Sequence, residues 1–366
     1  MRILHLSTWE TGGAAIAATR LSNTLNEMGE KSEVLHMSSR IPAYIDAAIG
    51  KLAHLNNPIF HSYNFFGKNI SAKISEFKPD IIHIHWIGAG FIRPESLAKY
   101  HLPIVWTLHD LWPLCGAEHL PGSNRFKDGY LNDNRPSGEN GLDLDRYVWE
   151  RKMKVFKDLK ITYVSPSNYV YEQAKSAMAM NSHKLIYIPN GVDTKIFHQT
   201  RSNQSEKMTV LFVANNPALD INKGYSDFQK AIGLLPVKLQ QKIEVKIVGG
   251  EVNSDSKMVD IYSSATIAVV PSKMETLSYV TMESMACSTP VVAYAVGGIA
   301  DLIDHKINGY LATPTDVKDL ARGIELLLSS PKLLTQFGKS SRTKIMKDFE
   351  LKKIGKRYLD LYQELI

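Results

Sequence analysis

Two carboxylates in an apolar segment are the first sign of chemistry. Glu275 and Glu283 lie within residues 271–298, a stretch rich in small and apolar side chains that contains one lysine. Ser278 is a suitable N-cap for a helix over 279–287, which places Glu275 in the loop before the helix and Glu283 inside it. Since a buried carboxylate needs hydrogen-bond donors, we expect ligand groups to meet these side chains. The simpler alternative is that Glu283 caps neighbouring backbone.

Several glycines and one lysine could bind a phosphate. Lys223 precedes an expected helix in the second half of the chain, Gly249 ends an expected strand, and Gly12 with Gly13 opens a helix of small residues. Lysines and helix starts both favour anions. The alternatives are a solvated lysine and glycines that permit close helix–sheet packing. The pattern is not G-x-G-x-x-G, and no acidic residue ends the second strand, so a dinucleotide-dependent oxidoreductase is disfavoured.

Elements that could position these residues alternate along the chain. Short β-branched runs separated by stretches of helical period predict two doubly wound α/β domains. We expect domains at 1–197 and 198–345, and a C-terminal segment at 346–366. The expected strands are 3–6, 32–36, 81–84, 104–108, 161–164, 185–188, 208–213, 245–248, 267–270, 291–294 and 309–311.

Composition narrows the class of protein. The 366 residues are 44% hydrophobic and 22% charged, without an apolar run long enough for a membrane span. The N-terminus is typical of a first strand, not of a signal peptide, and two cysteines are too few for a disulfide framework, so we expect a cytoplasmic protein. The net charge of +6 favours anionic partners. No RNA-binding or Arg-rich motif indicates nucleic acid.

One polar segment interrupts the α/β pattern. Residues 115–147 are rich in Gly, Pro and Asn. Loops of this length are usually functional or disordered, so the segment is expected to be either a loop that covers substrate or a surface insertion.

The motifs together resemble a known family. Glu275 and Glu283 have the E-x7-E spacing and are followed by "ESMACSTPVVAYAVGG"; the motifs "IPNGVDTKIF" and "TLHDLWP" lie upstream. The chain resembles the retaining glycosyltransferases of family 4, and within them the branch that builds bacterial surface polysaccharides such as O-antigens. The resemblance implies the GT-B fold, in which two Rossmann-like domains face each other across a cleft and the C-terminal helices return to the N-terminal domain.

The resemblance implies a nucleotide-sugar donor site. Glu275 would contact hydroxyls of the donor sugar, Glu283 would bind the ribose, and Lys223 would neutralise the leaving phosphate. The diphosphate would be held by backbone groups of Gly12, Gly13, Gly249, Leu277, Ser278 and Tyr279. No cofactor or metal is expected, because the resemblance implies a fold that generally works without one.

The resemblance also implies an acceptor site. His109 would lie beside the donor sugar and the acceptor, with Asp110 and Trp112 contacting the acceptor, a saccharide that is lipid-linked in this branch. Residues 57–78 interleave aromatic residues with lysines. They could lie on an anionic membrane surface as an amphipathic element, or form a core-facing helix with solvated lysines.

Two departures from the family pattern keep other functions open. Asn222 stands where an arginine often accompanies the phosphate lysine, and residues 251–260 are short for a base-binding loop. A GT-B nucleotide-sugar epimerase would bind the same donor without an acceptor, and a non-catalytic scaffold would bind it without turnover.

Overall fold

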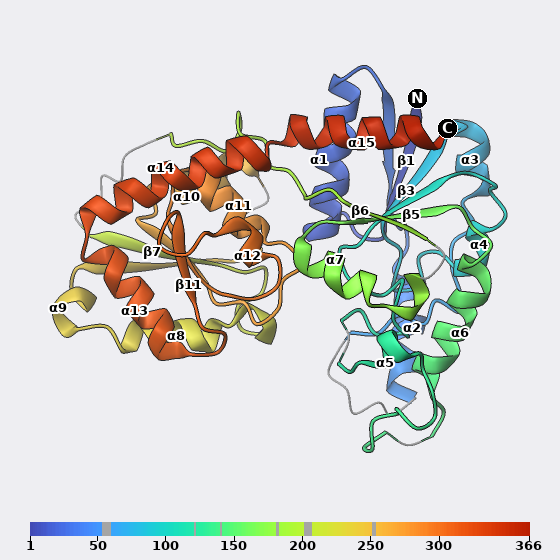
Figure 1. The fold of residues 1–366 in the computed structure, drawn as a ribbon, viewed down its shortest axis with the longest axis horizontal. Helices are drawn as coiled ribbons and strands as arrows, with labels where there is room; N and C mark the ends of the chain where they lie inside the picture. Colours follow the sequence, from blue (N-terminus) through green and yellow to red (C-terminus); the bar gives the residue numbers. More distant parts are fainter. Residues whose placement is uncertain (53–59, 121, 140, 181–182, 201–206, 251–253) are drawn as a thin grey trace. The chain divides into compact units, whose positions relative to one another are not determined.

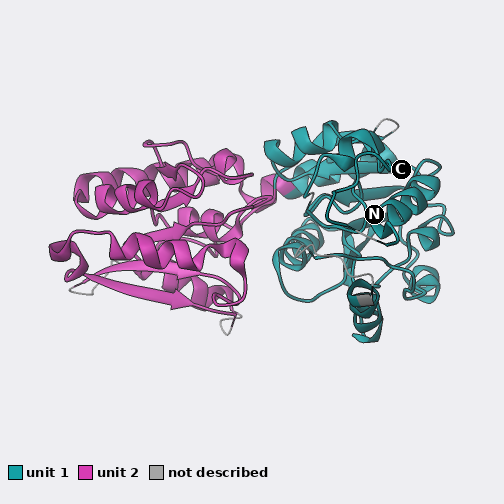
Figure 2. Cartoon of the chain, turned by 90° about the horizontal axis from the view of Figure 1, so that it is seen from below, with its two compact units in different colours: residues 1–189, 355–366 teal, residues 190–354 magenta. Residues whose placement is uncertain are grey.

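The computed structural model describes residues 1–52, 60–120, 122–139, 141–180, 183–200, 207–250 and 254–366. The chain forms two compact units, one of Met1–Pro189 with Gly355–Ile366 and one of Asn190–Ile354 (Figure 2). These divisions differ from the expected ones at 197/198 and 345/346. Phe197 is buried in the core of the second unit, and the backbone of Val192 pairs with that of Phe349 and Leu351, so both segments belong to that unit.

The first unit is built on a six-stranded parallel sheet with the order β2-β1-β3-β4-β5-β6 (Figure 1). Its strands are β1 Arg2–Ser7, β2 Lys31–Leu35, β3 Ile81–Trp86, β4 Ile104–Thr107, β5 Ile161–Ser165 and β6 Lys184–Tyr187. Its helices are α1 Gly13–Glu27, α2 Ile41–Leu52, α3 Ser71–Phe77, α4 Pro94–Leu97, α5 Arg125–Asp128, α6 Leu144–Phe156, α7 Asn168–Lys175 and η1 Met178–Met180.

The second unit contains a five-stranded parallel sheet with the order β11-β10-β9-β7-β8. Its strands are β7 Met208–Val213, β8 Ile243–Val248, β9 Ile267–Val270, β10 Val291–Tyr294 and β11 Gly309–Ala312. Its helices are η2 Ile221–Lys223, α8 Tyr225–Gly233, α9 Val237–Gln240, α10 Asp255–Ser264, α11 Tyr279–Ala286, α12 Ile299–Leu302, α13 Val317–Leu328 and α14 Pro331–Asp348. All eleven expected strands form, within two residues at each end.

Buried β-branched and aliphatic residues explain both sheets. Every residue of β4, β5, β9 and β10 is buried, which is the pattern of parallel strands covered by helices on both faces. Charged side chains are absent from these four strands, and each sheet reverses its strand order once. The reversal lies between β1 and β3 in the first unit and between β7 and β9 in the second.

The C-terminal helix completes the first unit. Helix α15, Leu351–Leu365, lies beside α1 (Figure 1), where Gly355 packs closely on Thr24. The hydroxyl groups of Tyr358 and Tyr362 form hydrogen bonds with Thr107 Oγ1 (2.9 Å) and His83 Nδ1 (2.6 Å). The predicted return of the C-terminal helix to the first domain is thus confirmed.

The polar segment 115–147 has a buried part and an exposed part, and its predicted role as a loop that covers substrate stays a prediction. Ala117, Phe126 and Tyr130 are buried, and the Tyr130 hydroxyl donates one hydrogen bond to Glu118 while accepting one from the Gly116 N–H. Lys152 on α6 is fully buried and donates to two backbone carbonyls of residues 112–116. Residues 115–119 and 126–130 therefore contribute to the packed interior of the first unit, whereas most described residues of 131–142 are exposed.

The segment 57–78 contains no continuous helix over its described residues, and its predicted contact with a membrane surface stays a prediction. Only Ser71–Phe77 is helical, and residues 57–59 lie outside the described part. Tyr63 is buried in a small apolar cluster, whereas Phe60 and Phe66 are more than half exposed. Among the described residues, no helix is long and apolar enough to cross a membrane.

Ser288 has an unusual backbone conformation at the end of α11. Its φ of 61° lies in the left-handed region, which glycine adopts readily and other residues rarely do. We predict that Ser288→Gly raises the free energy of unfolding of the second unit by about 0.5–1 kcal/mol, since the relief of strain exceeds the entropy that glycine adds to the unfolded chain.

Urea unfolding followed by far-ultraviolet circular dichroism measures this change. All five tryptophans lie in the first unit, so tryptophan fluorescence provides an internal reference that should not shift. Ser288→Ala keeps a Cβ and should give no gain. Equal stability of the glycine and alanine variants would contradict the prediction.

Candidate functional site

Lys223 and Glu275 meet where the second sheet reverses its strand order. Lys223 ends the loop after β7, and Glu275 lies in the loop after β9. Lys223 Nζ is 2.7 Å from Glu275 Oε1, which also accepts a hydrogen bond from Ser272 Oγ at 2.9 Å. The attraction of Glu275 raises the pKa of Lys223. Ligands of open α/β sheets bind at such a reversal, so this charged pair marks the best candidate site of the second unit.

Glycines let the neighbouring loops approach this pair. Gly224 has a φ of 70°, and a Cβ there would lie 2.0 Å from the Pro271 carbonyl oxygen. Gly297, after β10, has a φ of 51°, and a Cβ would lie 1.8 Å from the carbonyl oxygen of Glu275. Side chains at these two positions would separate the loops that carry Lys223 and Glu275.

Gly249 and Gly250 follow β8 at the same edge of the sheet. The Gly250 N–H donates to the Asn215 carbonyl at 3.0 Å, and a Cβ on Gly250 would collide with the Asn215 side chain. The strand end predicted at Gly249 is confirmed, since β8 ends at Val248 and a turn follows. The expected base-binding loop at 251–260 begins with residues 251–253, which lie outside the described part.

Glu283 has a protein partner that the sequence did not reveal. Its carboxylate is 6% exposed on α11, and Oε2 accepts a hydrogen bond from the Tyr262 hydroxyl of α10 at 2.9 Å. The expectation that ligand groups alone would satisfy Glu283 is wrong. The same holds for Glu275, whose cationic partner Lys223 is 52 residues away in sequence.

The start of α11 lies between these glutamates. Ser278 is its N-cap, as predicted, and its Oγ accepts a hydrogen bond from the Thr281 N–H. Leu277 and Ser278 are buried and Tyr279 is partly exposed. A helix N-terminus beside Lys223 and Glu275 supplies the partial positive charge that anions prefer.

Gly12 and Gly13 are exposed at the start of α1 in the first unit. Gly12 has a φ of 93°, and a Cβ on either glycine would meet no atom within 4 Å. The alternative that these glycines serve close helix–sheet packing is therefore wrong. The open backbone is compatible with approach of a ligand.

A pocket of about 630 Å³ lies at the reversal of the first sheet. It includes residues after β1, β2 and β3, among them the aromatic side chains of Trp9, Tyr44 and Phe60 and the cation of Arg40. Thr8 lines the pocket and its hydroxyl hydrogen-bonds the backbone carbonyl of Gly88, which fixes the two loops together. Aromatic rings with nearby polar groups suit a sugar ring or another amphipathic ligand.

His109, Asp110 and Trp112 follow β4 but differ in accessibility. Trp112 is 2% exposed, and its indole N–H donates to the Ser62 carbonyl at 2.9 Å, so it belongs to the core and presents no face to a ligand. Asp110 accepts hydrogen bonds from Trp86 and His119. Burial alone would raise the pKa of Asp110, but His119 and these hydrogen bonds lower it. His109 and Asp110 are both partly exposed, and His109 also has a ring nitrogen, Nδ1, that is not engaged by the described residues.

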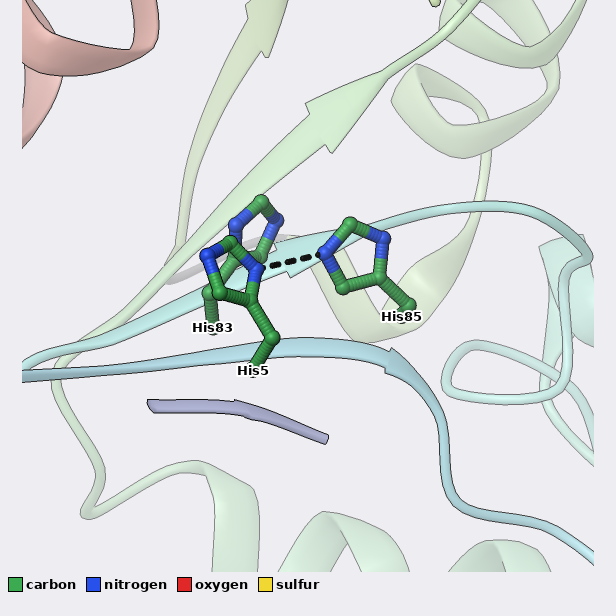
Figure 3. Close-up of side chains that lie close together, drawn as sticks. All are labelled: His5, His83 and His85. Carbon is green, nitrogen blue, oxygen red and sulfur yellow. Dashed lines mark hydrogen bonds between the residues drawn. The ribbon is translucent and has the colours of Figure 1, made fainter. Parts of the chain in front are cut away.

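A group of histidines lies behind His109. His5 on β1 and His83 and His85 on β3 are buried, and one nitrogen from each lies within 4.8 Å of the others (Figure 3). Such a spacing could suit a metal, but both His83 nitrogens already hydrogen-bond protein hydroxyls. Burial lowers the pKa of His5 to about 3 and that of His109 to about 4. The sequence shows these histidines in alternate positions of strands, but no motif marks them.

Comparisons with known proteins identify the family. The profile described as Glycosyltransferase Family 4 matches residues 11–196, about half of the chain, and the profile of Glycosyl transferases group 1 matches residues 250–344. The chain belongs to glycosyltransferase family 4. It is therefore a transferase, as the sequence predicted.

Individual relatives agree with this membership in family 4. An uncharacterised glycosyltransferase of Methanocaldococcus jannaschii is 22% identical, with 98% of this chain and 97% of the relative covered. Sucrose-phosphate synthase from Thermosynechococcus elongatus gives a TM-score of 0.74 at 16% identity over 100% of this chain and 98% of the other. Anabaena HepE in complex with UDP-glucose gives 0.66 at 15% identity over 100% of both chains. The predicted fold of two Rossmann-like domains is confirmed.

The buried histidines predict how acid affects this family 4 enzyme. Below pH 6.5 an unfolded histidine binds a proton, whereas folded His5 stays neutral down to about pH 3 and His109 to about pH 4. The unfolded state therefore binds more protons, and the stability of the first unit falls as pH decreases from 6.5 toward these values. Each such histidine contributes up to roughly 1.4 kcal/mol per pH unit.

Tryptophan fluorescence during urea unfolding at pH 7 and pH 5 reports this loss for the first unit. His5→Leu removes one titrating group. The stability of this variant's first unit should therefore fall less between pH 7 and pH 5 than that of the parent. Parallel losses in both proteins would show that His5 is protonated in the folded state.

Proposed function

We propose that the protein is a retaining glycosyltransferase that moves a sugar from a nucleoside diphosphate sugar to a saccharide acceptor. The observation that supports this most is the Lys223–Glu275 pair at the sheet reversal, next to the start of α11 and one buried glutamate within that helix. This arrangement combines a cation, a helix N-terminus and two carboxylates. Those groups match the phosphates and hydroxyls of a nucleotide sugar.

Lys223 and α11 would bind the diphosphate. Lys223 is about one third exposed and is held by Glu275, so a phosphate can approach the ammonium while Glu275 accepts hydroxyls of the sugar. Backbone N–H groups of Leu277, Ser278 and Tyr279 lie at the helix start and would donate to phosphate oxygens. Gly249, after β8 in the same unit, would allow a further backbone donor to approach, and the contact of Gly12 and Gly13 with the donor stays a prediction.

Glu283 would bind the ribose. Tyr262 donates to Oε2 and thereby fixes the orientation of the carboxylate. Two ribose hydroxyls are suitable donors to such an ionised acceptor. The complex of HepE with UDP-glucose supports a nucleotide-sugar donor. We further propose that this donor is a uridine or guanosine diphosphate sugar.

The proposed reaction breaks the bond between the sugar and the diphosphate. Charge develops on the leaving phosphate and on an oxocarbenium-like sugar, so Lys223 and the start of α11 would stabilise the leaving group. The acceptor hydroxyl would attack from the face that the diphosphate leaves and pass its proton to the phosphate. The described residues supply positive charge through Lys223, so no metal or other cofactor is invoked.

The acceptor would occupy the pocket of the first unit. Trp9, Tyr44 and Phe60 offer surfaces for sugar rings, and Arg40 offers a charge for an anionic group. His109 would contact the donor sugar and the acceptor. We further propose a lipid-linked acceptor, a role in bacterial surface polysaccharide synthesis, and a cytoplasmic enzyme at the inner membrane face.

Glu283→Gln tests the ribose contact. The amide still accepts a hydrogen bond from Tyr262, so the fold should persist, while loss of the charge should raise the donor KM by about 10- to 100-fold. Initial rates with a panel of nucleotide sugars measure this effect. Tyr262→Phe is the matched control, because it removes the protein contact and keeps the charge; it should have the smaller effect. An unchanged donor KM in Glu283→Gln would refute the assignment.

Lys223→Met tests the leaving-group contact. Loss of a cation that acts on developing charge should lower kcat by about 100-fold or more. Glu275→Gln breaks the same ion pair but keeps Lys223, so nucleoside diphosphate binding by calorimetry should survive in that variant and weaken in Lys223→Met. Release of free sugar or an epimer from labelled donor alone, with no transfer to any saccharide, would indicate an epimerase instead.

A further inference from the structure

His109 is the first member of a chain of three hydrogen-bonded imidazoles. His109 Nε2 lies 3.0 Å from His85 Nδ1, and His85 Nε2 lies 2.9 Å from His5 Nδ1, the contact drawn in Figure 3. A neutral imidazole has one N–H donor and one acceptor nitrogen. Both hydrogen bonds must therefore run in the same direction along the chain.

Burial keeps the three rings neutral. His5 and His85 are 0% and 2% exposed, and desolvation lowers the pKa of each, as it does for His109. Asp110 next to His109 acts in the opposite direction and does not overcome burial. Two arrangements of the protons remain, one for each direction in which the three imidazoles can donate their hydrogen bonds.

His5, the imidazole farthest from His109 in this hydrogen-bonded series, distinguishes the two arrangements. His5 Nε2 is buried and has no hydrogen-bond partner among the described residues. His83 packs against His5, with 4.9 Å between ring centroids, but its two nitrogens already bond to Thr107 and Tyr362. His5 Nε2 is therefore either a bare lone pair or an unsatisfied N–H. Buried N–H groups without a partner are the rarer and more costly case.

We propose that His5 and His85 are positioning residues that hold His109 with its proton on Nδ1. In this arrangement His5 Nδ1–H donates to His85 Nε2, and His85 Nδ1–H donates to His109 Nε2. His109 then presents Nδ1–H to a ligand as a hydrogen-bond donor and cannot act as a base through that atom. Which ligand group His109 meets, a hydroxyl or a ring oxygen, rests on the proposed function. The position of the proton on His109 does not depend on it.

Long-range ¹H–¹⁵N correlation spectra of the full-length chain labelled with ¹⁵N-histidine test the tautomers directly. Single substitutions of His5, His85 and His109 assign the signals. We expect all three rings to be protonated at Nδ1 and bare at Nε2, with no activity measurement needed. A proton on Nε2 of His109 overturns the proposal, as does the joint displacement of the His5, His83 and His85 signals by stoichiometric Zn²⁺, which would make the cluster a metal site.

His85→Asn and His85→Leu test the consequence for catalysis. The two side chains are similar in size, but only the asparagine amide can replace the donor at the position of Nδ1. His85→Leu should leave His109 as a mixture of tautomers and lower kcat about 10-fold, with donor KM within about twofold. His85→Asn should recover most of kcat.

Failure of the positioning role and failure of the proposed function give different experimental results. Equal kcat in both variants overturns the positioning role of His85, whether the two values are high or low. Absence of transfer in the unsubstituted protein argues against the proposed function, and the spectra then still decide the tautomer.

Discussion

Coverage of both sheet faces by helices is the constraint on which the rest of the structure depends. In a wholly parallel sheet the backbone is satisfied strand to strand and the side chains on both faces must be apolar or internally bonded. Along the central strands, charged groups can then reach solvent only at the strand ends, whereas the edge strand β8 exposes Glu244. Lys223 and Glu275 are in such positions, as is His109, and the reversal of strand order opens a space between the neighbouring loops. The candidate sites thus follow from the layering of the fold.

The histidines of β1 and β3 are the exception to this rule. They place polar rings on the strands themselves, and they remain there because nearly every ring nitrogen finds a partner in another ring or in a hydroxyl group of Thr107 or Tyr362. The one unsatisfied nitrogen, on His5, gives the network its direction. A buried polar network of this kind favours one arrangement of strands and side chains.

The sequence predicts local elements well and distant pairs poorly. All eleven strands and the N-cap Ser278 follow from short-range patterns of β-branched and capping residues. The pairing of Glu283 with Tyr262 and of Glu275 with Lys223 depends on which loops meet in space, and no local pattern encodes this. The burial within the polar segment 115–147 was not predicted, for a related reason. Its Gly, Pro and Asn residues indicate turns, but the buried Lys152 and Tyr130 that anchor those turns are recognisable only after folding.

The division of the chain between the units has a consequence during synthesis. Residues 355–366 belong to the first unit, where Tyr358 and Tyr362 bond to β4 and β3. On the ribosome the first 189 residues emerge early but lack residues 355–366, which are made only after the whole second unit. The first unit therefore cannot finish folding until these residues have also emerged. Until then the apolar surface under α15 stays uncovered, and such surface favours aggregation.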